Sequence, residues 1–437
     1  MNELSVPANH KVIIRSVPDY QDIDAIRKVV AEGMEDLGTK PFGRVLLKYN
    51  MVFAHKRFGR FAYTHPHVLE AIVDVLAARP EVEKVILGER TGVYVPTRYH
   101  FSQAGYEYLR GKPKVEVCFF DEDKLVEVVL EKGGFHKRLR FSRTLIEADY
   151  KVYTPKLKHH VSTKLTCAMK LNMGICDKKE RLRGHDYHLE EKIADLYEVG
   201  NPDLVVVDAI DIGQQNEIVP KPLRLGAIMM GTSGVAIDSV GARLLGFETG
   251  EIEHLKIARS RGWEPVTDDQ IEIKSDVSWD ELLEKTRDFD YTYSDLNKID
   301  TRIRFYLGNY PDGDEPCWGG CINMLKGALA VFEAYKQRSL KRAKPVAMVI
   351  GEYEGDIDGQ GYPVLLIGNC TRVKGNIQGK TRRIRGCPVA IPIFAALAPY
   401  YLKIPAPYLE KNPDQMYGFP YHLAVSYFHK FINRVFK

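Results

Sequence analysis

The sequence predicts an α/β protein with two domains, a larger one on a mostly parallel sheet and a second, smaller α/β domain that carries a cysteine cluster. Short β-branched runs alternate with helical patterns through residues 1–265, which is typical of βαβ units. A charged, aspartate-rich segment follows at 266–300, with helical patterns and few strand signals. Four of the seven cysteines lie beyond it, within 301–437. We therefore expect two domains joined by a helical connection.

Strands of the first domain are expected where the chain has short apolar runs. These runs lie at 11–14, 44–48, 84–88, 114–120, 150–154 and 204–208, and a helical pattern lies at 67–78. The run Leu204-Val205-Val206-Val207 is apolar at successive positions, so both faces of its strand should be covered. This pattern favours a parallel sheet with helices on each side.

The second domain is expected to begin near Thr301. A helical pattern at 321–338 is followed by strand patterns at 345–350 and 364–367. The segment 421–437 is an aromatic-rich basic helix, which we expect to dock on the core or in a homodimer. Contact with a membrane surface or another partner is the alternative for this helix.

The overall composition is that of an ordinary globular protein, with 45% hydrophobic and 27% charged residues among 437. The 62 basic and 58 acidic side chains leave a net charge of +4, which is too small to favour a nucleic-acid partner. No apolar run reaches the roughly 18 residues of a membrane span, so we expect no transmembrane segment. The N-terminus lacks the pattern of a secretory signal, and we therefore expect a cytoplasmic protein.

The late cysteines lie beside, or one residue from, glycine or proline. They are Cys317, Cys321, Cys370 and Cys387. Thiolates around an iron–sulfur cluster need tightly bent backbone with N–H groups directed at sulfur, which glycine and proline permit. We therefore predict that these four residues hold an iron–sulfur cluster of the [4Fe–4S] type. Structural zinc, or burial as small apolar side chains without metal, are the alternatives, because the spacing matches neither a ferredoxin run nor paired CxxC motifs.

A second concentration of chemistry lies at 155–174, directly after the predicted strand that ends at Thr154. Ligands of open α/β sheets bind at the carboxyl ends of the strands. We expect Lys158 and Lys170 in this loop to bind a carboxylate or phosphate. His160 is expected to act as an acid, a base or a metal ligand. A solvated basic loop is the alternative.

Further residues are candidates for the same edge of the sheet. His188, or else His185, is expected to share the role of His160. The candidates for contact with the substrate are Lys48, His65, Lys156, Thr166 and Asp238. The alternative for His65 is a surface position beside a helix cap, and for the turn before Asp238 it is helix capping.

Motifs in this part of the chain resemble those of a known family. In order, they are Lys48-Tyr49-Asn50, Thr64-His65-Pro66, Gly88-Glu89, and the segments 155–160, 169–174 and 234–246. Through them the chain resembles the domain of unknown function 362 family over about residues 40–265. His159 stands where the family more often has threonine, and Leu171 interrupts its usual lysine-asparagine pair. The resemblance implies no settled activity, but many members of that family are joined to iron–sulfur modules.

A more distant likeness is to the lactate racemase family. In that family a histidine at a strand end, a lysine in a glycine-rich turn and a later histidine hold a nickel-pincer nucleotide. His160 and Lys170, followed by His185 or His188, have that order here. The likeness implies a nickel cofactor as an alternative. The family's further histidine has no counterpart, because this chain reads Gly88-Glu89-Arg90-Thr91-Gly92 at that place.

These observations lead to three hypotheses about function. The first is an iron–sulfur enzyme, an oxidoreductase or lyase, that uses redox or Lewis-acid chemistry on a small anionic metabolite in the cleft between the domains. The second is a hydroxy-acid racemase or isomerase with a lysine-bound or metal cofactor at Lys170. The third is a non-catalytic electron-transfer or assembly module that works with a redox partner protein.

Overall fold

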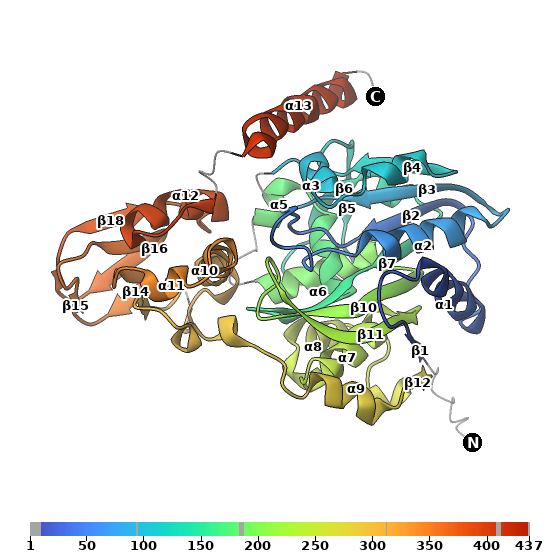
Figure 1. Ribbon diagram of the computed structural model, residues 1–437, viewed down its shortest axis with the longest axis horizontal. Coiled ribbons are helices and arrows are strands. Elements are labelled where there is room, and N and C mark those ends of the chain that lie inside the picture. Colours follow the sequence, from blue (N-terminus) through green and yellow to red (C-terminus); the bar gives the residue numbers. More distant parts are fainter. Residues whose placement is uncertain (1–9, 93–94, 183–187, 312, 408–411, 436–437) are drawn as a thin grey trace.

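The chain folds into two α/β units that lie side by side (Figure 1). A computed structural model describes residues 10–92, 95–182, 188–311, 313–407 and 412–435. The large-sheet unit comprises the described residues up to 300, and the small-sheet unit comprises those from 301 to 407. A C-terminal helix, α13 (Phe419–Val435), lies above the large-sheet unit in Figure 1. The predicted α/β class, with one large and mostly parallel sheet and smaller sheets beside it, is confirmed.

The large sheet has ten strands and is mainly parallel. Its main path is β12 (Ile271–Ser275), β1 (His10–Ser16), β11 (Lys221–Gly231), β10 (Leu204–Gln214), β7 (Tyr150–Thr154), β2 (Gly43–Tyr49), β3 (Val82–Glu89) and β4 (Val115–Phe119). Strand β11 runs antiparallel to both of its neighbours. Strand β8 (Lys156–His160) pairs in parallel with β10, and β9 (Lys164–Thr166) pairs antiparallel with β8.

Helices cover both faces of this sheet, as the unbroken apolar run of β10 predicts. Val205 and Val207 pack in one core with α6 (Leu189–Gly200), α7 (Gly234–Leu244) and α8 (Glu253–Ser260). Leu204 and Val206 pack in the opposite core with α1 (Ile23–Asp36) and α2 (Pro66–Ala77). Successive residues of a strand point to opposite faces, so β10 contributes to both cores and is buried throughout.

Shorter elements complete the large-sheet unit. They are α3 (Thr97–Gln103), α4 (Arg143–Ile146), α5 (Lys178–Leu182), the hairpin β5 (Leu125–Val129) and β6 (Arg138–Ser142), and the turn η2 (Met169–Gly174). The segment 266–300, expected to be a helical connection, contains α9 (Trp279–Thr286) and also the strand β12. Strand β12 pairs with the edge strand β1, and its signal was weak because it is short and surrounded by charged residues.

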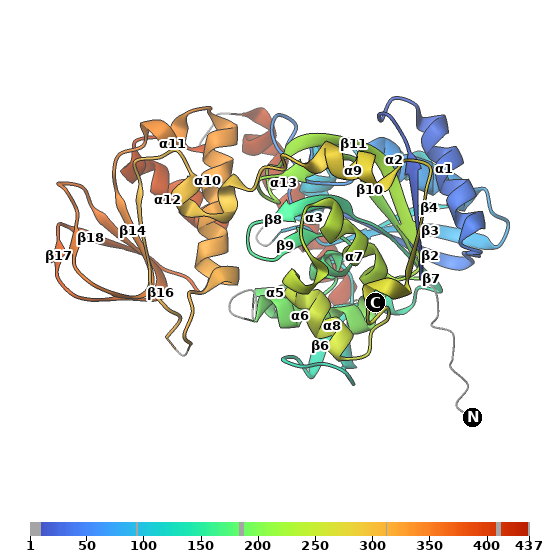
Figure 2. The same cartoon turned by 90° about the horizontal axis from the view of Figure 1, so that it is seen from below.

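The small-sheet unit is a parallel sheet with helices packed on one core. The strand order is β13 (Arg304–Leu307), β14 (Ala347–Glu354), β16 (Val364–Lys374) and β18 (Thr381–Ile384). Its helices are α10 (Asn323–Tyr335), α11 (Ser339–Arg342) and α12 (Ile391–Leu402), and a small ladder joins β15 (Ile357–Asp358) to β17 (Ile377–Gln378). The core under α10 also contains Val161 and Ile218 from the large-sheet unit, so apolar packing joins the two units. Figure 2 shows α10 on the side of the small sheet that faces the large unit.

Helix α13 docks on the large-sheet unit but leaves aromatic side chains exposed. Phe419 and His422 contact the ring of Tyr99 in α3, and the Asn433 side-chain amide donates to the Glu122 carbonyl at 2.6 Å. Its exposed aromatic residues are Tyr421, Tyr427, Phe428 and Phe431. Among the described residues, no helix combines the length and apolar character that crossing a bilayer requires.

Candidate functional site

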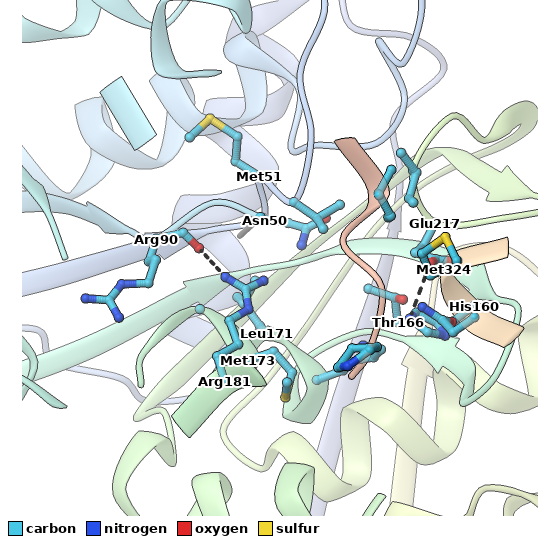
Figure 3. Close-up of a pocket in the computed structure, with 18 of the residues that line it drawn as sticks. Asn50, Met51, Arg90, His160, Thr166, Leu171, Met173, Arg181, Glu217 and Met324 are labelled. Atoms are coloured by element: carbon cyan, nitrogen blue, oxygen red, sulfur yellow. Dashed lines mark hydrogen bonds and ion pairs between the residues drawn. The ribbon is translucent and has the colours of Figure 1, made fainter. Parts of the chain in front are cut away.

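A cavity of about 180 Å³ opens where the carboxyl ends of the large sheet meet the small-sheet unit. Figure 3 shows its lining side chains converging from both units. The polar and charged lining residues are Asn50, Glu89, Arg90, Lys158, His160, Thr166, Lys170, Arg181, Glu217 and Asn323. The small-sheet unit also contributes Gly320, Met324 and the segment 388–392. The strand-end position predicted for ligand binding is therefore the position of this cavity.

Lys158 and His160 lie in a buried hairpin rather than in a solvated loop. Both belong to β8, which pairs with β10 on one side and with β9 on the other. Every residue of β8 is buried. Because Lys158 and His160 are two positions apart, both side chains point to the same face, toward the cavity. The basic run forms a strand because its charged groups find hydrogen-bond partners inside the protein.

The Lys158 ammonium is fully buried and partly satisfied by backbone. Its Nζ donates to the carbonyls of Ala62 and Glu217, the latter at 2.9 Å. Burial, partly opposed by the Glu217 carboxylate and reinforced by the Lys170 charge, lowers the pKa of Lys158 to about 7. An ammonium has three donors, so one remains for a ligand in the cavity. Lys158 can therefore bind an anion and change its charge near neutral pH.

His160 and Glu217 form an acid–base pair on the cavity wall. The His160 Nδ1 atom accepts from the backbone N–H groups of Ser162 and Thr163, both at 3.2 Å. In a neutral ring this leaves the proton on Nε2, which lies 3.6 Å from Glu217 Oε1 (Figure 3). Burial raises the pKa of Glu217. The pair can accept a proton from a bound molecule or return one to it.

Lys170 reaches the cavity from the turn η2 and is 8% exposed. Its ammonium forms no hydrogen bond or ion pair with a residue in the described part of the chain. Burial lowers the pKa of Lys170 to about 8. The carboxylate of Asp238 accepts from the N–H groups of Ala168 at 2.6 Å and Met169 at 3.1 Å, which fixes the start of η2. Asp238 therefore positions Lys170 and lies outside the cavity lining.

Lys48 also lies outside the cavity lining and positions a residue that belongs to it, Glu89. Its buried Nζ lies 2.9 Å from Glu89 Oε1, and Glu89 lines the cavity. Burial lowers the pKa of Lys48 and raises that of Glu89. A Cβ at Gly174 would lie 2.1 Å from Glu89 Oε1 and 2.7 Å from Lys48 Nζ. The glycine that ends η2 is thus required by the close approach of this ion pair.

Two arginines on the cavity wall were not predicted. Arg181 of α5 donates to the Thr91 carbonyl at 2.5 Å and the Arg90 carbonyl at 3.3 Å (Figure 3). Arg90 in turn donates to the carbonyls of Phe120 and Cys176, both at 2.6 Å. Nothing in the charged sequence around Arg181 separates it from a surface arginine. For Glu89 and Arg90 a signal did exist, because they directly follow the apolar run 84–88 that predicted this strand, and ligands bind at the carboxyl ends of such strands.

Three buried polar atoms of the cavity residues have no hydrogen-bond partner in the described part of the chain. They are Thr166 Oγ1, Asn50 Oδ1 and Arg90 Nε. All three residues line the cavity, and all are at least nine-tenths buried. A buried polar group without a hydrogen bond is costly, so these atoms are suited to a bound molecule or ordered water.

Three other candidates lie away from the cavity lining. Lys156 is buried against Asp208 at 2.9 Å and donates to the Tyr20 hydroxyl at 2.6 Å. His65 caps α2, and its ring stacks on Tyr20. His188 precedes α6 and lies 2.5 Å from Glu191. The alternative candidate, His185, lies outside the described residues.

The four late cysteines line one small cavity of about 10 Å³ in the small-sheet unit. Glycines with positive φ lie in or just after three parallel strands of the small sheet: Gly351 (78°) within β14, Gly368 (101°) within β16 and Gly386 (152°) after β18. Cys370 closely follows Gly368, and Cys387 directly follows Gly386. Cys317 directly precedes the turn η7 (Trp318–Ile322), and Cys321 lies within this turn, before α10.

The cysteine cavity is tightly built around its sulfurs. A Cβ at Gly368 would lie 3.3 Å from Cys321 Sγ and 3.8 Å from Cys370 Sγ. The N–H of Val389 donates to Cys321 Sγ at 3.5 Å, and burial raises the pKa of Cys321 to about 11. In the described residues, no group of three or more histidine, cysteine, aspartate and glutamate side chains is arranged to hold a metal ion.

The cavity lined by the four cysteines lies next to the cavity of about 180 Å³ that contains Lys158 and Lys170, which we call the cationic cavity. Pro388 lines both of them. Gly320, which precedes Cys321, also lines the cationic cavity. The small-sheet unit therefore contributes a wall that the two cavities share at Pro388.

Comparison with known proteins gives a family match over part of the chain and a weak likeness to solved structures. No curated protein matches the chain. The chain is similar to the lactate racemase apoprotein from Thermoanaerobacterium thermosaccharolyticum at 14% identity and a TM-score of 0.36, over 55% of this chain and 57% of that protein. The chain thus spans a little over half of that protein's length. Residues 45–243 match the family described as Domain of unknown function (DUF362), which confirms the resemblance carried by the motifs.

Proposed function

We propose that the protein is an iron–sulfur enzyme that acts on a small carboxylate or phosphate metabolite bound in the cationic cavity. One observation carries the proposal. The four cysteines line one cavity, and Pro388 is common to the walls of that cavity and of the cavity lined by Lys158 and Lys170. A thiolate site and an anion site built this close together suit a reaction in which both take part.

The residues present fit a [4Fe–4S] cluster. Cys317, Cys321, Cys370 and Cys387 would supply four thiolates from tightly bent backbone. When bound, the cluster would supply electron transfer or, with one open iron, Lewis acidity. Reduced thiols also suit a cytoplasmic location.

The cationic cavity fits a small anion. Lys158 and Lys170 offer ammonium donors, and Arg181 adds positive charge beside them. Thr166 Oγ1 and Asn50 Oδ1 supply polar atoms that have no protein partner. A volume of about 180 Å³ is below the roughly 300–1,000 Å³ of sites for drug-sized molecules, so a small metabolite is favoured.

The same cavity contains groups that can transfer protons. His160 Nε2 lies 3.6 Å from Glu217 Oε1, burial raises the pKa of Glu217, and burial lowers the pKa of Lys158 to about 7. Positioned acids and bases within reach of a bound molecule can exchange protons with it. In this assignment the lysines hold the anionic end of the metabolite, and the His160–Glu217 pair takes up or returns its proton.

Anaerobic purification with iron and acid-labile sulfide analysis, and with absorption and electron paramagnetic resonance spectra, tests the proposal. The expected result is a brown protein with about four irons per chain and absorbance near 400 nm. Cys317→Ser or Cys387→Ser should lose this absorbance, while Cys118→Ser, which lies outside the cysteine cavity, should keep it. A colourless oxygen-free preparation without iron would overturn the proposal.

A second candidate is a hydroxy-acid isomerase or racemase with a cofactor at Lys170. The observation that favours it is the Lys170 ammonium, which lies in the cavity with no hydrogen-bond partner among the described residues and shares that cavity with the His160–Glu217 pair. A visible band lost in Lys170→Ala but retained in Cys370→Ser would support it. The opposite pattern would exclude it in favour of the iron–sulfur enzyme.

A further inference from the structure

We propose that the edge of the small-sheet unit around β18 is the docking surface for an acidic electron-transfer protein. The inference rests on the proposed function, because the electron is exchanged with the cluster held by the four cysteines. One electron would leave the reduced iron–sulfur centre of the partner and reduce that cluster, with no bond or proton changing place. The argument comes from the charge, the exposure and the connectivity of this edge.

The charge of this part of the chain is strongly one-sided. No aspartate or glutamate occurs from residue 359 to residue 409. The same stretch contains the cations Arg372, Lys374, Lys380, Arg382, Arg383, Arg385 and Lys403. The whole protein has a net charge of only +4, so the remainder of the chain is slightly acidic by comparison. The excess positive charge therefore belongs to the unit that carries the cysteines.

Only part of this charge is neutralised by nearby carboxylates. On β16, Lys374 lies 3.0 Å from Glu354, and Arg372 lies 3.7 Å from Glu352. On the edge strand β18 and directly before and after it, the exposed residues Lys380, Arg382 and Arg385 form no ion pair with an acid in the described part of the chain. These three cations define the β18 patch, and they remain available to an acidic surface.

The β18 patch continues into the cysteine cavity. Arg383 of the same strand donates to the carbonyls of Gly368 and Thr371, both at 2.8 Å, and so holds the turn that contains Cys370. Cys387 follows Arg385 by two residues. It is exposed, whereas Cys370 is partly buried and Cys317 and Cys321 are buried. Electron transfer between proteins weakens steeply with distance, so a partner seated on the β18 patch would lie on the most exposed side of the cluster.

Charge complementarity favours an acidic redox protein for this site. Opposite charges raise association rates by about 10- to 1,000-fold at low salt, and the effect falls with ionic strength. A nucleic acid is the other polyanion that such a patch attracts. The redox protein is favoured because the β18 patch ends two residues before the exposed Cys387, and a cysteine has no role in reading a phosphate backbone.

The test uses the anaerobically purified full-length protein and an acidic low-potential [2Fe–2S] ferredoxin. Lys380→Glu/Arg382→Glu/Arg385→Glu is compared with a control of equal charge change, Lys28→Glu/Lys40→Glu/Lys84→Glu, on the large-sheet unit. Binding of the oxidised ferredoxin is measured by calorimetry, and reduction of the cluster by stopped flow. At low salt, we expect the patch variant to show about tenfold lower affinity for the oxidised ferredoxin and an about tenfold lower rate of cluster reduction. Both quantities should change less than twofold in the control.

The arms of the experiment separate this inference from the proposed function. Reduction of the cluster by dithionite should be equal in all three proteins, which shows that the cluster is intact. If the Lys380→Glu/Arg382→Glu/Arg385→Glu variant fails to fold, the milder variant Arg382→Gln/Arg385→Gln replaces it. That variant should also bind ferredoxin more weakly, by a smaller factor. Equal ferredoxin binding in all variants, or affinity without salt dependence, would overturn the docking surface even if iron is present. Tight binding of a duplex oligonucleotide that displaces ferredoxin would overturn it in favour of nucleic acid.

Discussion

Gly174 lies so close to the Glu89 carboxylate that a Cβ at this position would stand 2.1 Å from Oε1. Glu89 cannot move aside freely, because it accepts from Lys48 Nζ at 2.9 Å and from the Arg90 N–H at 2.7 Å. The glycine therefore allows η2, which carries Lys170, to pack directly on this ion pair. The last residue of η2 and the last residue of β3 fix one wall of the cationic cavity together.

Gly174→Ala is therefore expected to destabilise the fold by about 1–3 kcal/mol, as overpacking at a buried site does. Unfolding in urea measures the change. Gly250→Ala is the control, because nothing lies within 4 Å of a Cβ there, and it should stay within about 0.5 kcal/mol of the wild type. Equal stability of Gly174→Ala and the wild type would contradict the packing described.

Much of the architecture could be predicted from the sequence, because the spacing of apolar residues and the positions of glycines indicate local structure directly. The run Leu204–Val207 predicted a strand covered on both faces, and β10 contributes to both cores. Glycines beside the cysteines predicted sharp bends, and Gly368 and Gly386 have positive φ. These signals are local, and local conformation decides them.

The cavity lining was less accessible because tertiary contacts decide it. Lys156 and Lys158 are two residues apart in one strand, yet one is paired with Asp208 and the other reaches the cavity. Arg181 stands in a charged helix that reads as surface, and its role depends on the distant carbonyls of Arg90 and Thr91. Only the folded chain shows which of several lysines or arginines has no carboxylate partner.

Anion binding in the cationic cavity should weaken as the pH rises. Burial lowers the pKa of Lys158 to about 7 and that of Lys170 to about 8. Both ammonium groups are charged below these values and neutral above them, so an anion binds best at low pH. Oxalate affinity, measured by calorimetry, is expected to fall about tenfold between pH 6.5 and pH 8.5.

Variants identify the groups responsible for this pH dependence. Lys158→Met should weaken oxalate binding and remove the lower part of the transition, whereas Lys40→Met on the surface should leave the profile unchanged. Affinity that is constant across this pH range in the wild type would show that neither lysine binds the anion.

The buried His254 should stabilise the fold in a pH-dependent way. Its Nδ1 lies 2.7 Å from Glu190, and its Nε2 lies 3.8 Å from Asp238, the residue that fixes the start of η2. Although burial lowers it, these carboxylates raise the pKa of His254 to about 9. A raised pKa gives a stabilisation that is complete below the unfolded value of about 6.5 and is lost as the pH rises through 9.

His254→Gln is therefore expected to cost about 3 kcal/mol at pH 6, and the difference from the wild type should shrink above pH 9. Chemical unfolding at several pH values measures it. His10→Gln, at a partly exposed ion pair with Glu264, is the control and should change stability by less than about 1 kcal/mol. A cost for His254→Gln that does not vary with pH would mean that the ring is neutral in the folded protein.

Gly368→Ala should impair metal loading more than it impairs folding. Gly368 has φ of 101°, and a Cβ there would lie 3.3 Å from Cys321 Sγ and 3.8 Å from Cys370 Sγ, in space that bound cluster atoms and their thiolates need. Gly361 is a matched control, because it has φ of 77° but nothing within 4 Å of a Cβ. Both substitutions carry the backbone strain of a side chain at positive φ, about 1 kcal/mol or more, so strain alone affects them alike. Iron per chain after anaerobic purification should fall below half of the wild-type value in Gly368→Ala and remain near it in Gly361→Ala; equal loss in both would trace the effect to strain rather than to crowding at the sulfurs.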